Sequence, residues 1–296
     1  MELLIENDKN KFDKYTETYE KNIFPFVEYF DNEIKKFGYS ENSPLGIERD
    51  IWDYKQIIQY PIRKLEYSFV LHNCKDFLKP RMKTLDAGCG ITPTARWFAS
   101  KGCEAYGIDL RQDNINYIKK SESFLYDPKV NYSSQNMTSL EFEDDTFDVV
   151  TSISVLEHLG PEKDTKAISE MLRVLKAGGK LILTVDFSNR EGELNYNIKF
   201  GLNLLKSGKI KETMQRLQRS KFLLKRDTAY NHDSLMKRII IPFKNNIEGD
   251  MNKKIYVSVN DIKKFWRMYW QPGFLYTKNE PRTYVSVGLV LSKNNG

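Results

Sequence analysis

The sequence predicts an α/β fold, a doubly wound and mostly parallel sheet with an antiparallel edge strand. Between residues 83 and 186, five short apolar segments alternate with helical ones, which is typical of a parallel sheet with helices on both faces. A tight glycine turn directly follows the first of these segments. The turn therefore stands at the carboxyl end of a strand, where open sheets of this kind bind ligands.

The predicted elements follow from apolar runs that glycine, proline and polar residues interrupt. Helices are expected near residues 94–101, 112–123 and 164–175, and Ala177-Gly178-Gly179 would end the last one as a glycine-rich C-cap. Two later strands, at 274–278 and 284–292, would form an antiparallel pair at the sheet edge. The strands of the parallel part are expected at residues 83–87, 104–109, 130–133, 147–153 and 180–186.

Two helical appendages accompany this sheet. Residues 1–80 predict an N-terminal helical cap, and its last helix carries Arg63, Glu66, Tyr67 and Val70 and runs up to residue 78, before Lys79-Pro80. Residues 189–254 predict a helical insertion, or lid, after the fifth strand. The insertion divides the sheet domain into residues 81–188 and 255–296.

Composition is typical of a soluble globular protein, since 40% of the residues are hydrophobic and 29% are charged. The longest apolar stretches are far shorter than the roughly 20 residues that a membrane-spanning helix needs. The N-terminus carries early acidic residues and lacks the pattern of a secretory signal. These observations predict a cytoplasmic protein without a membrane span.

Cysteine and histidine usage argues against a disulfide framework and against a metal site. The chain has three cysteines without Cys-x-x-Cys spacing and three histidines that are scattered along the sequence. We therefore expect reduced thiols and no bound metal.

The net charge of +6 is distributed unevenly. Residues 201–240 contain ten Lys or Arg against three acidic residues. Two interpretations stay open, a solvated helical face or a basic lid that attracts an anionic acceptor. In the second case, the side chains expected to face the acceptor are those of Arg216, Arg219, Arg226 and His232.

Two elements of the predicted sheet carry the chemistry. The segment Asp86-Ala87-Gly88-Cys89-Gly90 joins a strand to a helix, where glycines let a ligand approach the backbone and the helix offers unpaired N–H groups. It lacks the third glycine of the dinucleotide fingerprint. Asp109 closes the next strand, about 20 residues on, where a carboxylate can accept hydrogen bonds from both hydroxyls of a ribose.

Four motifs in order extend this pattern. They are Leu85-Asp86-Ala87-Gly88-Cys89-Gly90, Gly107-Ile108-Asp109, Phe147-Asp148-Val149-Val150-Thr151-Ser152 running into Val155-Leu156-Glu157-His158, and Leu172-Arg173-Val174-Leu175-Lys176-Ala177-Gly178-Gly179. Together they resemble the motifs of class I S-adenosylmethionine (SAM)-dependent methyltransferases, in the small-molecule branch with type 11/UbiE-like motifs. The resemblance covers residues 83 to about 186 and implies a Rossmann-like domain with SAM as its cofactor.

The resemblance implies a role for each matching position. Gly88, Cys89 and Gly90 would pass close to the methionine part of SAM, and Asp86 would organise their loop. Asp109 would hold the ribose.

The adenine and the transferable methyl group would meet a second set of residues. Leu110 would lie against the adenine face. Asn136 stands where the family often has an acid, and its amide oxygen would accept a bond from the adenine amino group while the backbone N–H of Met137 reaches a ring nitrogen. Ser152 and Ile153 would line the cofactor beside the methyl group.

Candidate catalytic residues follow these strands. His158 would either take a proton from the acceptor or pack the helix after the fourth strand. Asp186 would bind the acceptor or cap the segment that follows the fifth strand. Arg63 and Tyr67 would close over the methionine carboxylate, unless Arg63 forms a plain surface pair with Glu66.

The expected reaction is direct methyl transfer to oxygen or nitrogen of a small molecule, such as a sugar, a nucleotide-linked sugar or another natural product. An RNA methyltransferase would explain the basic stretch, but no RNA-binding module is recognisable, so nucleic acid is not the expected partner. A NAD-dependent oxidoreductase and a non-catalytic SAM-binding module are further alternatives. A homodimer is compatible with the sequence.

Overall fold

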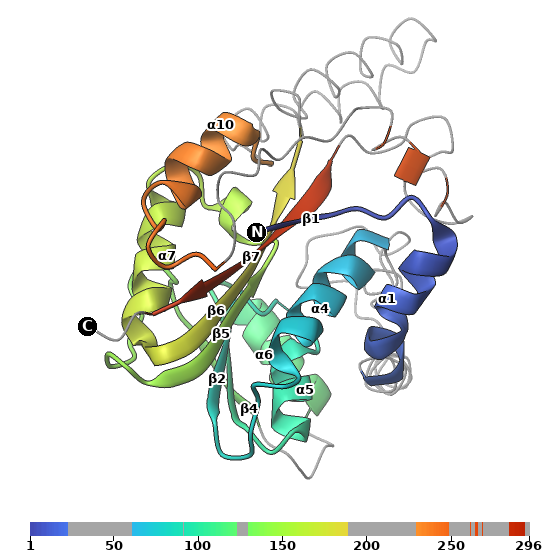
Figure 1. The fold of residues 1–296 in the computed structure, drawn as a ribbon. Helices are drawn as coiled ribbons and strands as arrows, with labels where there is room; N and C mark the ends of the chain where they lie inside the picture. The colour runs from blue at the N-terminus through green and yellow to red at the C-terminus, as the bar shows by residue number, and fades with distance from the viewer. Residues whose placement is uncertain are drawn as a thin grey trace, which may run out of the picture.

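The computed structural model describes residues 1–22, 61–90, 92–122, 130–188, 229–248, 261, 264, 265, 268 and 284–293. Within them, one seven-stranded sheet has the order β1-β7-β6-β5-β2-β3-β4 (Figure 1). The parallel strands are β2 (Lys83–Ala87), β3 (Glu104–Asp109), β4 (Val130–Ser134), β5 (Phe147–Ile153) and β6 (Leu175–Phe187). The predicted α/β fold with a mostly parallel sheet is therefore confirmed.

The antiparallel edge is made from the two ends of the chain. Strand β7 (Val285–Ser292) pairs with β6, and β1 (Glu2–Leu4) pairs with the other side of β7, with Leu3 opposite Val287. Ile247 bridges to Leu291 on that same side of β7. These two short pairings cover an edge whose N–H and C=O groups would otherwise be open to other chains. Strand β1 was not predicted, and the predicted strand at 274–278 lies outside the described residues.

Helices cover both faces of the sheet (Figure 1). On one face lie α4 (Pro61–Cys74), α5 (Thr94–Ser100) and α6 (Gln112–Glu122), with α1 (Lys9–Asn22) packed outside α4. On the other lie α7 (Lys163–Val174), α10 (His232–Leu235) and the π-helical turn η2 (Met236–Ile240). Strand order reverses at β2, which lies between β3 and β5, so the ligand-binding crevice of such a sheet opens at the carboxyl end of β2.

Helix α4 is buried on nearly every side because it lies between α1 and the sheet. Tyr67 of α4 stacks on Tyr19 of α1, with ring centroids 5.6 Å apart. The helix ends at Cys74 rather than at residue 78, and in the turn that follows it the N–H groups of Phe77 and Leu78 both donate to the Cys74 carbonyl. Cys74, Cys89 and Cys103 are buried, and no disulfide joins any two of them.

The predicted glycine C-cap of α7 is wrong. Helix α7 ends at Val174 because Leu175 already has extended backbone and pairs with Phe147 of β5. The register then shifts, so that Lys180 pairs with Val149, and the residues between form a bulge. Gly178 has a φ of 73° in that bulge, and its N–H donates to the Lys293 carbonyl.

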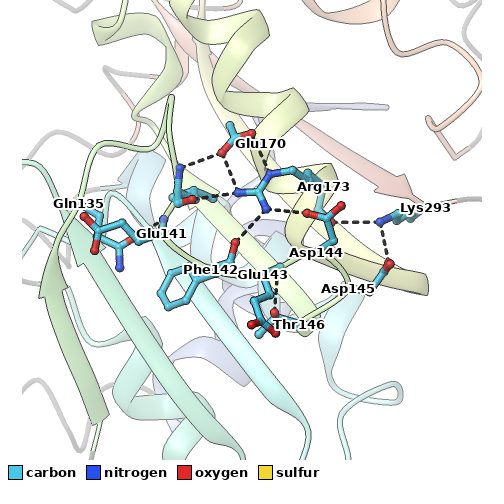
Figure 2. A network of polar contacts seen from close by, with 11 residues as sticks. Gln135, Glu141, Phe142, Glu143, Asp144, Asp145, Thr146, Glu170, Arg173 and Lys293 are labelled. Carbon is cyan, nitrogen blue, oxygen red and sulfur yellow. Dashed lines mark hydrogen bonds and ion pairs between the residues drawn. The ribbon is translucent and has the colours of Figure 1, made fainter.

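Figure 2 shows how the loop between β4 and β5 is fastened at the edge of the sheet where β5 begins. The Arg173 guanidinium donates to Glu170, to Asp144 and to the carbonyl oxygens of Leu140 and Phe142. Because these acceptors satisfy most of its N–H groups, Arg173 holds the loop in one conformation. This network lies at the end of the sheet opposite the carboxyl ends of the parallel strands, so we assign it a structural role.

Part of the predicted insertion, residues 229–248, is docked on α7 and on the end of β6. Tyr230 pairs with Phe187, and its N–H donates to the Asp186 carbonyl at 2.8 Å. The fully buried Asp164 of α7 accepts from the Tyr230 hydroxyl and from Arg238 Nε, both at 2.6 Å. A buried carboxylate thus fastens the segment to α7.

We predict that Asp164→Asn destabilises the fold by about 3–5 kcal/mol, since it removes the buried carboxylate that faces Arg238. Urea denaturation, followed by circular dichroism, measures the loss. The exposed Asp76 supplies a control, because Asp76→Asn removes the same charge and should leave the midpoint unchanged. Equal midpoints for all three proteins would show that the Asp164 contacts do not stabilise the fold.

Candidate active site

The glycine loop after β2 folds back onto the neighbouring strand. The N–H groups of Gly88 and Cys89 both donate to the Ile108 carbonyl, at 2.8 Å each. Gly88 has a φ of 78°, and a Cβ at this position would lie 2.7 Å from a methyl carbon of Val155. Only glycine fits here, because both the backbone conformation and the packing exclude a side chain.

Asp86 is buried beneath this loop. Its carboxyl accepts from Thr151 Oγ1 at 2.9 Å and from Thr92 Oγ1 at 3.4 Å. Burial raises the pKa of Asp86 to about 7, although the hydrogen bonds from the two threonines oppose that rise. Asp86 therefore contacts the loop and β5 from below. The sequence analysis assigned no role to Thr92 or Thr151. The available signal for Thr92 was its place two residues after the glycine turn.

Asp109 stands at the end of β3 and joins three neighbouring groups. Its Oδ2 accepts from the Gly90 N–H at 3.0 Å, while Oδ1 accepts from the Arg111 N–H at 2.8 Å and from Asn114 Nδ2 at 3.2 Å. A carboxylate offers about four acceptor positions, so capacity remains on Oδ2 for a ligand hydroxyl. Beside it, Leu110 is 69% exposed, which is unusual for a leucine and leaves an apolar surface at the crevice.

The segment after β4 forms a tight turn. Asn136 Oδ1 accepts from the backbone N–H of Thr138 at 3.0 Å and from its hydroxyl at 2.9 Å, and Met137 is buried. Both lone pairs of the Asn136 oxygen are thus engaged. For that oxygen to accept a bond from an adenine amino group, the turn must release one of these two bonds.

The end of β5 places polar atoms at the carboxyl edge. Ser152 is fully buried, and its Oγ has no hydrogen-bond partner among the described residues. Ile153 is half-buried beside it. Ser154 has a φ of 52°, a conformation that is uncommon for a residue other than glycine and that marks functional or strained positions.

Helix α4 contributes a buried ion pair to this edge. Arg63 donates to Glu66 Oε2 at 2.5 Å, and Glu66 Oε1 accepts from the hydroxyls of Ser154 and Ser286. The Glu66 side chain is fully buried, so the pair is not the plain surface pair that helical spacing also allowed. Tyr67, next on the helix, is buried, and burial raises the pKa of its hydroxyl well above the usual value.

The two predicted catalytic residues differ in their surroundings. His158 ends the short helix η1 (Leu156–His158) and is exposed. Asp186 is 7% exposed near the end of β6, and its backbone N–H donates to Glu157 Oε1 at 3.3 Å. Burial, followed by the nearby charge of Asp186, raises the pKa of Glu157 well above its usual value.

Of the residues expected to face an anionic acceptor, Arg216, Arg219 and Arg226 lie outside the described residues. His232 is half-buried at the first position of α10, directly after Asn231, which caps that helix. In the described part of the chain, no group of three or more His, Cys, Asp or Glu side chains is arranged to hold a metal ion, and no helix is both long and apolar enough to cross a membrane.

Comparisons with known proteins agree with this geometry. Residues 85–183 match the family model described as a methyltransferase domain. A relative from Shewanella pealeana, the ubiquinone/menaquinone biosynthesis C-methyltransferase UbiE, is 35% identical over 120 residues, which cover 39% of this chain and 47% of the relative. Phosphoethanolamine N-methyltransferase 2 of Caenorhabditis elegans is 33% identical over 108 residues, 36% of this chain and 24% of that protein.

These matches define a domain rather than a whole protein, since the chain spans less than half the length of either relative. A solved structure of a methyltransferase from Galdieria sulphuraria has a TM-score of 0.52 at 13% identity and covers 81% of this chain and 88% of that one, which shows the fold alone. The cofactor of these methyltransferases is SAM. Residues 85–183 of this chain form a methyltransferase domain of the SAM-dependent class.

Proposed function

We propose that this chain transfers the methyl group of SAM to nitrogen or oxygen of a small-molecule acceptor bound at the carboxyl edge of the sheet. The observation that carries the proposal is the junction of the glycine loop with Asp109, where the Gly90 N–H donates to the carboxylate beside the exposed Leu110. We assign the carboxylate to the ribose and the apolar side chain to the adenine, and the two stand next to each other at the end of β3, beside the switch point of the sheet.

The residues present fit the cofactor. A carboxylate oxygen of Asp109 with remaining acceptor capacity stands at the end of β3. The buried Ser152 Oγ, which has no hydrogen-bond partner among the described residues, stands at the end of β5, on the other side of β2. The backbone of the Gly88–Gly90 loop carries no side chain at its two glycines, which lets a ligand come close. When bound, SAM supplies an activated methyl group on a sulfonium, so the protein has mainly to align the acceptor and exclude water.

The match to a methyltransferase domain does not specify which atom is methylated or which class of molecule carries it. The two relatives named above methylate nitrogen in one case and carbon in the other, by their names. The basic stretch at 201–240, with ten Lys or Arg against three acids, supports an acceptor that carries an anionic group.

The proposal is tested by SAM consumption. The protein is incubated with SAM and fractionated small-metabolite extracts, and methylated products are identified by mass. Calorimetric titration with S-adenosylhomocysteine provides the binding test that needs no acceptor. Absence of both binding and consumption would exclude a methyltransferase.

We expect Asp109→Ala to weaken the binding of S-adenosylhomocysteine at least about tenfold, because hydrogen bonds to a charged group contribute about 1.5–3 kcal/mol each. Calorimetry measures the dissociation constant. The matched control is Asp113→Ala, which removes an exposed carboxylate in the first turn of α6 and should bind as the wild type does. Unchanged affinity in Asp109→Ala would contradict the placement of the ribose.

His158→Ala is expected to lower kcat less than a hundredfold, since the side chain is exposed and a true general base contributes about 10²–10⁴ in rate. Initial rates over a range of acceptor concentrations give kcat and KM. A larger loss, with stability and S-adenosylhomocysteine affinity unchanged, would identify His158 as the base.

Replacing Arg216, Arg219 and Arg226 together by Gln should raise KM for the acceptor about tenfold and leave cofactor affinity unchanged. Attraction between exposed charges is screened over about 8–10 Å at physiological salt, so kcat/KM should also fall as salt rises. The control replaces Lys9, Lys11 and Lys14 of α1, all exposed, by Gln. If both triple variants behave alike, the basic stretch is a solvated face.

A further inference from the structure

A buried group of acidic side chains lies at the carboxyl edge, between α4, η1 and β6. Its members are Glu66, Glu157 and Asp186, together with Arg63. Both oxygens of Glu66 are paired, because Arg63 and two serine hydroxyls donate to them. The Arg63 guanidinium donates to Glu66, and its charge also acts on the other two carboxyls.

Glu157 is the member whose hydrogen bonding is incomplete. Its side chain is 1% exposed, and Oε1 accepts from the Asp186 N–H at 3.3 Å. Oε2 is buried and has no hydrogen-bond partner in the described part of the chain. Buried polar atoms in folded proteins are nearly always paired, and leaving one unpaired costs about 1–3 kcal/mol. An orphan oxygen at this edge therefore points to a missing donor.

The charged and titratable groups that face Glu157 come from each element around it. They are Arg63 and Glu66 of α4, Asp186 of β6, and Tyr230 of the docked segment. Among these described groups, two are acids and one is a base, and that base, Arg63, also pairs with Glu66, so negative charge outweighs positive charge among them. A donor that also carried a positive charge would meet both deficits.

This group adjoins the cofactor loop. Val155, two residues before Glu157, packs against Gly88, and Ser154 links the end of β5 to Glu66. Asp186 stands near the end of β6, the next strand along the sheet. Glu157 and Asp186 thus lie at the edge where the acceptor must meet the methyl group.

We propose that Glu157 and Asp186 form a subsite that binds a protonated amine of the methyl acceptor, with Glu157 Oε2 accepting one of its N–H bonds. The subsite rests on the proposed function, since it shares the crevice. An ammonium supplies both a donor and a counter-charge, a hydroxyl supplies only the donor, and a carboxylate is repelled. The acceptor therefore carries an ammonium group, and any anionic group that it also carries lies away from this subsite.

The experiment uses the full chain saturated with S-adenosylhomocysteine and three probe sets with identical carbon skeletons: primary alkyl and arylalkyl amines, the matching alcohols and the matching carboxylic acids. The midpoint of thermal unfolding is measured with each probe. Amines are expected to raise the midpoint, and alcohols and acids to leave it unchanged. The shift with amines should grow from pH 6 to pH 8, because their binding favours the ionised form of Glu157 and the probes stay protonated.

Glu157→Gln should abolish the amine shift or weaken amine binding at least about tenfold, as expected for losing a charge-assisted hydrogen bond. Glu162→Gln, which removes an exposed carboxylate on the neighbouring loop, should retain it. The proposal is overturned if amines and alcohols act alike or if the amine shift survives in Glu157→Gln. Failure of S-adenosylhomocysteine itself to stabilise the protein would instead count against the proposed function.

A ligand-free measurement checks the charge at this position. The pKa of Glu157 is raised in the folded protein, so the native state keeps a proton that the unfolded chain loses above about pH 4. The stability linked to that proton is complete below this pH and is lost as the pH rises toward the folded pKa. Wild type should therefore lose stability relative to Glu157→Gln between pH 4 and pH 8. A constant difference would show that Glu157 keeps no extra proton in the folded protein and would contradict the charge assigned to this subsite.

Discussion

The Glu66 carboxylate is the contact on which the arrangement of this edge depends. It is fully buried, and it accepts from Arg63 within α4, from Ser154 after β5 and from Ser286 in β7. An isolated carboxylate in such a place would cost several kcal/mol, which makes its donors obligatory. Because those donors come from three segments far apart in sequence, satisfying one buried charge fixes the helix that covers the sheet against two of its strands.

Ser154 shows how that constraint reaches the cofactor loop. Its φ of 52° is unfavourable for a residue with a side chain, and it is held by the bond to Glu66 and by its own N–H, which donates to the Thr184 carbonyl. The chain therefore leaves β5 in a fixed direction and sets Val155 over Gly88. Gly88 has a positive φ, and the buried carboxyl of Asp86 lies below it. The shape of the loop is therefore fixed by Val155 on one side and by Asp86 on the other.

Sequence patterns predicted the elements whose signal is local. Strands β2, β3 and β5 have the predicted bounds, because each is an apolar run ended by a turn or a polar residue. Strand β1 has three residues and becomes a strand only through its pairing with β7, so no local pattern marks it. The end of α7 is likewise set by a distant contact, because Leu175 pairs with Phe147 of β5.

The candidate site divides in the same way. The glycine loop, Asp109 and the exposed Leu110 belong to contiguous motifs and were expected from the sequence. The incomplete hydrogen bonding of Glu157 was not, because it arises where Asp186 and Arg63, distant in sequence, meet around it. The motif that contains Glu157 was visible, but its burial and its unpaired oxygen exist only in three dimensions.

Residues 229–248, the described part of the predicted insertion, lie against the end of β6. Tyr230 adds one residue of parallel pairing beside Phe187, donates its N–H to the Asp186 carbonyl and accepts from the Ser188 N–H at 2.7 Å. Its hydroxyl is fixed by Asp164 of α7. The backbone of Asp186 is therefore held at its N–H by Glu157 and at its carbonyl by Tyr230, so the docked segment helps to fix the position of the Asp186 carboxyl group at this edge of the sheet.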